Sequence, residues 1–280
     1  MASGKGGTGK TTIAVNLALY LAKSHKVALF DVDVEEPDDN QFLHFKLLTH
    51  KRVNISRPLI NESICSHCGL CAELCEFNAL AVLPAQVMVF EELCHGCGLC
   101  SMACPEKAVE EKSHELGIIR KSDNRNSNLV FFEGRLNIGE ALAKPIIREL
   151  KKMAFEEKYE HIILDLPPGS ACPVIEALSE TDFAVLVTEP TPAGEHDLRI
   201  AIDLVRQLDI PFGIVNNRSD VGDDRIDRLV INEDYELLLN IPHDNEILQL
   251  YSNGHPLIGK KWEFDSTFSH LWTRIGEVMK

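Results

Sequence analysis

The chain has 280 residues, 45% of them apolar and 25% charged, which is enough for one sizeable α/β domain with a small additional module. Its 43 acidic and 28 basic residues give a net charge of −15, so neither nucleic acid nor an anionic membrane is expected as a partner. No apolar run is long enough for a transmembrane helix and no signal peptide precedes the first motif, so we expect a cytoplasmic protein.

The first motif is a glycine-rich loop, Gly4-Lys5-Gly6-Gly7-Thr8-Gly9-Lys10-Thr11, that fits the phosphate-binding pattern GxxxxGK[ST]. The apolar run Thr11–Lys23 follows it and predicts a buried helix, which is the context that such a loop requires. We expect the backbone N–H groups of Gly6 to Lys10 to hold the β-phosphate at the helix N-terminus. Lys10 would reach the β- and γ-phosphates, Thr11 would bind Mg2+, and Thr12 would contact the α-phosphate.

Only Met1 and Ala2 stand before the Ser3-Gly4 start of this loop, where a strand is expected. Either the start is truncated or misassigned, or the sheet accepts a very short strand. We therefore expect weaker ATP binding and lower stability than in a version extended at its N-terminus.

Four short apolar segments predict strands that are buried on both faces: Val27–Asp31, Ile162–Asp165, Phe183–Thr188 and Phe212–Asn217. Between the last two, Glu195–Leu208 has the apolar spacing of an amphipathic helix. Alternating strands and helices indicate an α/β fold with a doubly wound, mostly parallel sheet. Such sheets bind ligands at the carboxyl ends of their strands, where the polar residues are Asp31, Asp33, Asp165 and Asn217.

Eight of the nine cysteines lie between Cys65 and Cys104, in two copies of the spacing C-x2-C-x2-C-x3-C. In a cytosolic protein such cysteines indicate metal binding or catalysis rather than disulfides. From Pro58 to Glu106 there is no lysine or arginine, while six glutamates form either a docking face for a basic electron-transfer partner or a merely solvated surface. We interpret residues 58–111 as a module inserted into a discontinuous domain of residues 1–57 and 112–280.

The two cysteine runs resemble those of bacterial two-cluster ferredoxins, in which the fourth cysteine of each run binds the other cluster. The resemblance implies a small α+β domain with one 4Fe–4S cluster on Cys65, Cys68, Cys71 and Cys104, and a second on Cys94, Cys97, Cys100 and Cys75. Two structural zinc sites are the alternative, which the tandem runs disfavour. His67 and His95 either tune the clusters through hydrogen bonds or are exposed loop residues.

The complete loop SGKGGTGKTT resembles the deviant phosphate loop of the MinD/ParA ATPases, a group that includes the nitrogenase iron protein and Mrp-type cluster carriers. In that group the extra lysine, here Lys5, reaches the phosphates of the opposite subunit in a nucleotide-sandwich dimer. The resemblance implies a homodimer, or a heterodimer with a paralogue, in which catalysis is completed across the interface. The alternative for Lys5 is a solvated loop lysine.

Other segments extend this resemblance over the chain outside the insert. "FDVDVEEPD" matches the first switch, with Asp33 orienting the attacking water, and "ILDLPPG" matches Walker B and the second switch. The resemblance implies a Mg2+ site of Thr11, Asp33 and Asp165, and a catalytic group of Lys5, Lys10, Asp33 and Asp165. In "IVNNR" and "IPHDNEI", the residues that match adenine-contacting positions are Asn217, Pro242 and Asp244.

The ninth cysteine, Cys172, lies seven residues after Asp165, the offset of a cluster-binding cysteine in the nitrogenase iron protein. The second cysteine of that bridging site has no counterpart here, and the C-terminal CxxC of Mrp-type carriers is also missing. Cys172 therefore either makes a transient metal contact at the dimer axis or is a small buried residue near the second switch.

The C-terminal segment places five apolar side chains on one helical face: Phe268, Leu271, Trp272, Ile275 and Met279. Its other face carries little positive charge, so we predict a closing helix packed on the sheet rather than a membrane-targeting helix.

Together these patterns predict a P-loop NTPase with an inserted ferredoxin-like domain that binds ATP, Mg2+ and two 4Fe–4S clusters. The leading hypothesis is an ATPase whose nucleotide state is coupled to the clusters, for ATP-dependent electron transfer or for iron–sulfur or metal-cofactor assembly on a client protein. The alternative is a ParA/MinD-like spatial or regulatory switch with redox-sensing or structural clusters, against which the acidic charge counts.

Overall fold

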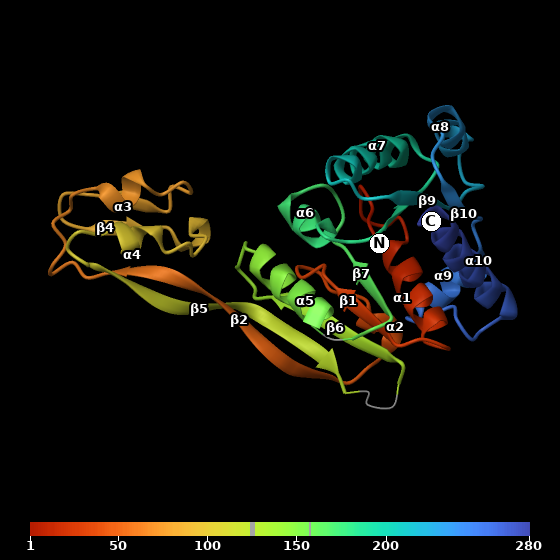
Figure 1. The fold of residues 1–280 in the computed structure, drawn as a ribbon, viewed down its shortest axis with the longest axis horizontal. Coiled ribbons are helices and arrows are strands. Elements are labelled where there is room, and N and C mark those ends of the chain that lie inside the picture. Colours follow the sequence, from red (N-terminus) through yellow and green to blue (C-terminus); the bar gives the residue numbers. More distant parts are fainter. Residues whose placement is uncertain (124–126, 157) are drawn as a thin grey trace.

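The computed structural model describes residues 1–123, 127–156 and 158–280. It consists of an α/β body, a two-stranded ribbon that projects from it, and a cysteine module (61–108) at the far end of the ribbon (Figure 1). The strands of the body are β1 (Val27–Asp31), β6 (Leu129–Leu136), β7 (His161–Asp165), β8 (Ala184–Thr188), β9 (Phe212–Asn217) and β10 (Leu237–Ile241). Its helices are α1 (Lys10–Leu21), α2 (Asn40–Leu43), α5 (Lys144–Glu156), α6 (Cys172–Leu178), α7 (Pro192–Gln207), α8 (Arg225–Glu233), α9 (Asn245–Ser252) and α10 (Trp262–Val278).

The ribbon pairs two long antiparallel strands, β2 (Leu47–Ile60) and β5 (Val109–Ser122). Only the Gly117–Lys121 part of β5 also pairs with β6, so the rest of the ribbon extends away from the body. The module at its end contains α3 (Leu70–Glu73), β3 (Leu80–Val82), β4 (Val87–Val89), the short 3-10 helix η1 (Glu91–Leu93) and α4 (Leu99–Ala103).

The first three residues of the chain connect the two parallel parts of the sheet. Ala2 donates a backbone hydrogen bond to Val185 of β8 (2.9 Å), while the Met1 carbonyl accepts one from Leu166, just after β7 (3.1 Å). Residues 1–3 therefore occupy the strand position between β7 and β8, and the sheet order is β2-β5-β6-β1-β7, then residues 1–3, then β8-β9-β10. The sheet accommodates a very short strand before the glycine-rich loop.

Each face of the sheet carries its own hydrophobic core, because successive residues of a strand point to opposite faces. On one face, Leu29 and Phe131 pack with α1 and α10. On the other, Phe30 stacks on Phe132, with ring centroids 4.5 Å apart, beneath α5 to α8. With helices packed on both faces, the carboxyl ends of the parallel strands lie together along one edge of the sheet, where the candidate site lies.

The predicted α/β class with a mostly parallel sheet is confirmed. β1 and β9 have the predicted bounds, and β7 and β8 differ from them by one residue. The predicted closing helix is α10, which buries Phe268, Leu271 and Ile275 against α1 and the sheet. Met279 does not belong to that buried face, since it is 48% exposed beyond the end of α10. Within the described ranges, no helix has both the length and the apolar character needed to cross a bilayer.

Candidate functional site

The glycine-rich loop wraps the N-terminal end of α1, and its shape depends on two glycines. Gly7 and Gly9 have φ angles of 78° and 92°, a left-handed conformation that costs glycine little. A Cβ on Gly9 would also lie 2.4 Å from the Asn217 side-chain nitrogen. That nitrogen donates a hydrogen bond to the Thr8 carbonyl (2.8 Å), so Asn217 at the end of β9 directly braces the loop.

Lys10 and Thr11, the first residues of α1, meet the carboxylate of Asp165 at the end of β7. The Lys10 Nζ atom lies 2.9 Å from Asp165 Oδ1, and the Thr11 hydroxyl donates to Asp165 Oδ2 (2.7 Å). Burial lowers the pKa of Lys10, but the charge of Asp165 outweighs this and raises it, so Lys10 is held protonated. The Thr11 hydroxyl also lies 3.2 Å from Asp38, which brings a second carboxylate to the predicted Mg2+ site.

A group of three carboxylates, Asp31, Asp38 and Asp39, lies beside this contact, with ligand atoms within 4.8 Å of one another. Asp31 accepts backbone N–H bonds from Asp33, Asp38 and Asp39, so it shapes the loop after β1. Burial, followed by the neighbouring charge, raises the pKa of Asp31 and Asp39 well above the usual range. Both carboxylate oxygens of buried Asp39 lack a hydrogen-bond donor among the described residues. Such an uncompensated carboxyl group fits a site that takes up a divalent cation.

Asp33, the predicted water-orienting residue, lies on the cleft wall rather than in this carboxylate group. Burial raises its pKa to about 6, although the charge of Lys10 opposes the shift. A carboxylate with a raised pKa beside a phosphate-binding lysine is suited to hydrogen bonding with water.

The cleft above the loop has a volume of about 700 Å3, within the range of nucleotide-sized sites. Asp33 lines it, and so do most of the predicted nucleotide-binding residues: Gly6, Gly7, Thr8, Gly9, Lys10, Thr11, Thr12, Asn217, Pro242 and Asp244. Gly4, Lys5 and Asp165 do not line the cleft. Gly4 packs against α7, where an added Cβ would lie 2.3 Å from the Asp197 carbonyl.

Lys5 does not line the cleft and is paired within its own chain. Its ammonium group contacts Glu189, which also accepts a hydrogen bond from Arg218 (3.0 Å). Lys5 is therefore not a freely solvated lysine in this conformation. Glu189 follows the last residue of β8, the kind of strand-end position that predicts a functional side chain, yet the sequence analysis missed it.

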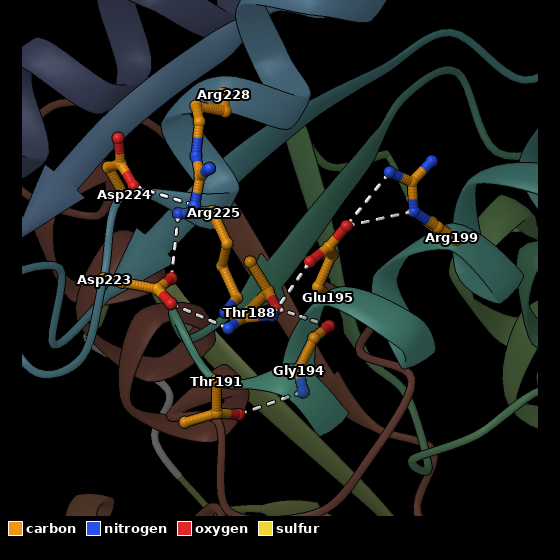
Figure 2. Close-up of polar contacts among 9 residues, drawn as sticks. All are labelled: Thr188, Thr191, Gly194, Glu195, Arg199, Asp223, Asp224, Arg225 and Arg228. Atoms are coloured by element: carbon orange, nitrogen blue, oxygen red, sulfur yellow. Dashed lines mark hydrogen bonds and ion pairs between the residues drawn. The ribbon is translucent and has the colours of Figure 1, made fainter.

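The start of α7, just after Glu189 in the sequence, takes part in a polar network (Figure 2). The Thr191 hydroxyl accepts from the Gly194 N–H at the start of α7 (3.0 Å), an ordinary helix cap. Glu195 of α7 accepts hydrogen bonds from the guanidinium groups of Arg199 and Arg225. Arg225 also donates to Asp223 (2.7 Å). These bonds connect the start of α7 to the start of α8 and to the loop before it.

The eight clustered cysteines surround two neighbouring cavities in the cysteine module. One cavity is lined by Cys65, Cys68, Cys71 and Cys104. The other is lined by Cys75, Cys94, Cys97 and Cys100, and Cys71 also reaches it. The structure thus brings together the same two groups of four that the ferredoxin resemblance implies.

The surroundings of these cysteines fit sulfur ligands of an iron–sulfur cluster. Backbone N–H groups of Ala79 and Ala108 donate to the sulfurs of Cys75 (3.3 Å) and Cys104 (3.2 Å), the fourth cysteine of each run. Such bonds favour the thiolate form that metals bind. Burial raises the pKa of the Cys71 and Cys100 thiols, a cost that bound iron would remove. Of the two histidines, His67 lies near Glu62 (3.0 Å) and His95 stacks on Phe77.

Cys172 is exposed at the first turn of α6, in the body and apart from the cysteine module (Figure 1). It is therefore not a buried packing residue in this conformation. Among the residues that the sequence analysis missed, Asp38 and Asp39 had a visible signal in the acidic run "EPDD" after Asp33.

Comparison with known proteins identifies the family of the body. The family model described as "CobQ/CobB/MinD/ParA nucleotide binding domain" matches residues 1–257. Two uncharacterized proteins of Methanocaldococcus jannaschii are 32% identical over 91% of this chain and 89% of their own length, and 30% identical over 99% and 95%, respectively. An iron-sulfur cluster carrier protein of Pyrococcus abyssi is 22% identical over 91% of this chain and 77% of its own.

The fold has solved counterparts as well. The septum site-determining protein MinD of Pyrococcus horikoshii, solved with Mg-ADP, has a TM-score of 0.61 at 20% identity, covering 98% of this chain and 93% of its own. The sheet order, the loop before α1 and the family match agree with one another. The chain therefore belongs to the CobQ/CobB/MinD/ParA family of nucleotide-binding domains and carries a cysteine-rich module between β2 and β5.

Proposed function

We propose that this protein is a Mg-ATP-hydrolysing iron–sulfur protein of the cytoplasm that couples its nucleotide state to two 4Fe–4S clusters. The observation that carries the proposal is the pairing of a nucleotide-sized cleft in the body with two four-cysteine cavities in the module. We assign residues 58–111 to the two-cluster domain and residues 1–57 and 112–280 to the ATPase domain. The similarity to proteins named iron-sulfur cluster carriers supports work on a client's iron–sulfur or metal cofactor.

In the proposed ATPase site, the backbone of residues 6–10 and the Lys10 ammonium group bind the phosphates of ATP. Thr11 and Asp165 would hold Mg2+, and Asp38 would take the place among its ligands that the sequence assigned to Asp33. Asp33 would orient the water that attacks the γ-phosphate. For this, the present contact between Lys10 and Asp165 has to loosen when the phosphates and the cation arrive. Asn217, Pro242 and Asp244 would contact the adenine base.

Lys5 completes the site from the partner subunit of a homodimer, or of a heterodimer with a paralogue. In the single chain Lys5 is paired with Glu189, and 29% of its side chain is exposed. Because Glu189 would keep its hydrogen bond from Arg218 (3.0 Å), the ammonium group can exchange Glu189 for a phosphate on an opposing subunit without leaving this carboxylate unpaired. The Lys5 ammonium group would then stabilise the negative charge on the phosphates of the opposite subunit, and this is possible only in the dimer.

In the proposed module, Cys65, Cys68, Cys71 and Cys104 hold one cluster, and Cys75, Cys94, Cys97 and Cys100 hold the other. When bound, the clusters supply one-electron chemistry. The cysteines of each site come from both runs, so the clusters serve as resident groups that also hold the module together. Electrons or metal would pass between this module and a redox or metallo-cofactor client.

The test is anaerobic and uses the protein with both clusters in place. ATP turnover is measured with the clusters reduced and oxidised, and cluster potentials are measured with and without Mg-ATP. We expect each quantity to respond to the other. If ATP turnover is the same in both cluster states and the cluster potentials are the same with and without Mg-ATP, the proposed coupling is wrong and the clusters are structural.

A further inference from the structure

A buried arginine stands where the cysteine module, the ribbon and the body meet. Arg57, on β2, has a side chain only 9% exposed, and its two terminal nitrogens bind two different carboxylates. One donates to Glu91 of the module (2.9 Å) and the other to Glu140 of the body (2.7 Å). Arg57 is therefore a fork that joins two regions far apart in the sequence.

On the module side, the fork ends directly beside a cysteine site. Glu91 opens the 3-10 helix η1, and Cys94 follows that helix. The cysteine loop itself sits on the ribbon, since a Cβ on Gly96 would lie 2.9 Å from the Ser56 carbonyl. Ser56 and Pro58 line the cavity of Cys75, Cys94, Cys97 and Cys100, which we call the proximal cavity. The other cavity is lined by Ile60 and Val109, at the far end of the ribbon.

On the body side, the fork ends in the turn that follows β6. The N–H of Glu140 donates to the Asn137 carbonyl (3.1 Å), and the N–H of Leu136 donates to the carbonyl of Val34 (2.8 Å). Val34 is the residue next to Asp33, and it is fully packed against β6 at Gly134. A shift of residues 33–34 is therefore passed directly to the end of β6 and to its turn.

The two contacts of Arg57 differ in their exposure to water, since the Glu91 side chain is 61% exposed whereas Glu140 is held in a largely buried position. Glu140 is 14% exposed and binds His114 (2.7 Å) in addition to Arg57. Burial alone would raise the pKa of Glu140, but the contacts with His114 and Arg57 hold it below its usual range. The contact between the buried Arg57 and Glu140 is therefore costly to break, because it would leave a buried charge without its partner, while the exposed Glu91 adds a directional hydrogen bond on the module side.

We propose that Arg57 and Glu140 are positioning residues that transmit movement of the loop after β1 to the proximal cavity. The route runs from Val34 to Leu136, through the turn to Glu140, and across Arg57 to Glu91 and Cys94. This inference rests on the proposed function, because it names the path by which nucleotide state reaches a cluster. It also distinguishes the two cavities: nucleotide binding would change the surroundings of the proximal cavity first, and the other cavity lies farther from the body, at the far end of the ribbon.

The test compares Glu140→Gln and Arg57→Lys with the wild type, all carrying both clusters. Glu140→Gln keeps the shape of the side chain and removes its charge, while Arg57→Lys keeps the charge and removes the fork. The matched control is Glu115→Gln, which removes an exposed ion pair with Arg52 (2.5 Å) across the same ribbon without touching the module. Iron content and ATP turnover establish that each variant is intact.

Two readouts are followed on adding Mg-ATP or a non-hydrolysable analogue: cluster potentials, and hydrogen exchange in the peptide of residues 86–94. In the wild type and the control we expect both to change. In Glu140→Gln and Arg57→Lys we expect each change to fall to about a third or less, while turnover stays near that of the wild type.

The outcomes separate the path from the function. If the wild type responds to nucleotide and both variants respond equally well, the Arg57 path is overturned and the proposed coupling survives. If the control loses its response as much as the variants do, the ribbon as a whole carries the signal and the fork has no special role. If the wild type responds in neither readout, the proposed coupling fails and this path fails with it.

Discussion

The α/β body and the cysteine module are stabilised in different ways. The body buries large side chains completely, among them Phe30, Phe131 and Phe132, in two cores. In the module, the buried apolar residues are only Ala79, Leu80, Val87, Cys94 and Ala108. Several larger ones are exposed there, including Met102 at 75% and Leu93 at 47%.

This difference shows that burial of apolar side chains stabilises the two regions to different extents. A core the size of the body's supports folding without any ligand, whereas so few buried apolar groups cannot offset the entropy of ordering 61–108. The module therefore depends on what its cysteines bind. The following experiments test whether the regions are separate in stability and joined in function.

The largest effect is expected in the body, from Lys5→Ala. Loss of a charge supplied in trans should lower ATP turnover by about a thousandfold, with no loss of iron from the module. Turnover and iron content are measured on the same sample. Lys152→Ala, at an exposed lysine of α5, is the control and should leave turnover unchanged.

A mixing experiment then tests the trans contact itself. Lys5→Ala and Lys10→Ala chains are each inactive, but their mixed dimer has one site with an intact Lys10 and the partner's Lys5. We expect the mixture to recover turnover. A mixture that stays inactive would show that Lys5 acts within its own subunit.

Removal of iron from the folded protein should affect only the module. We expect the amides of 61–108 to lose about a hundredfold or more of their protection from hydrogen exchange, while those of β1 and β6 keep theirs. Mass spectrometry of peptides before and after anaerobic chelation measures both. Cys172→Ser serves as a control that retains the iron. Loss of protection in the body as well would contradict the separation of the two regions.

The smallest effect concerns the short N-terminal strand. Burial lowers the pKa of the Met1 amino group from 8.0 to about 6. The unfolded chain therefore binds more protons between about pH 6 and 8, so the free energy of unfolding should rise by about 1–2 kcal/mol across that range. A version extended by four apolar residues replaces this group with a peptide N–H and should lose that part of the pH dependence.

The same extended version should bind ATP more tightly and melt at a higher temperature, because it lengthens the strand between β7 and β8. Urea unfolding of both versions at pH 6 and pH 8 gives the pH-dependent change in the free energy of unfolding for each. The difference between these two changes isolates the contribution of the Met1 amino group, because all other titrating groups are common to both versions. Equal melting temperatures and equal ATP affinities would contradict the expectation.

Local motifs were the most predictable part of the molecule. The glycine-rich loop, β1 and the two cysteine runs depend on short spacings that can be read directly from the sequence, whereas the grouping of the cysteines across the runs came from the resemblance to ferredoxins. β6 was missed although it lies beside β1, because its place in the sheet is set by pairing with residues about a hundred positions away.

Polar contacts between distant segments were the least predictable. Lys5 and Glu189 are 184 positions apart, and Arg57 and Glu140 are 83 apart. No local pattern specifies such partners, since their meeting depends on how sheet and ribbon are assembled. The buried pair Asp31 and Asp39 is intermediate, because the acidic run is visible but its burial is not.

The projecting part of the ribbon is also a lever. Beyond Gly117, the eight residues Val109–Leu116 pair within the sheet only with β2, and strands advance about 3.3 Å per residue, which gives a length of about 25 Å. The contacts of Arg57 and His114 with Glu140 tie the first part of this length to the body. A rotation of about 10° at its base would move the far end by about 4 Å, more than the length of a hydrogen bond. A small rearrangement at the base of the ribbon would thus move the outer cysteine cavity by a distance that makes or breaks contacts with another protein.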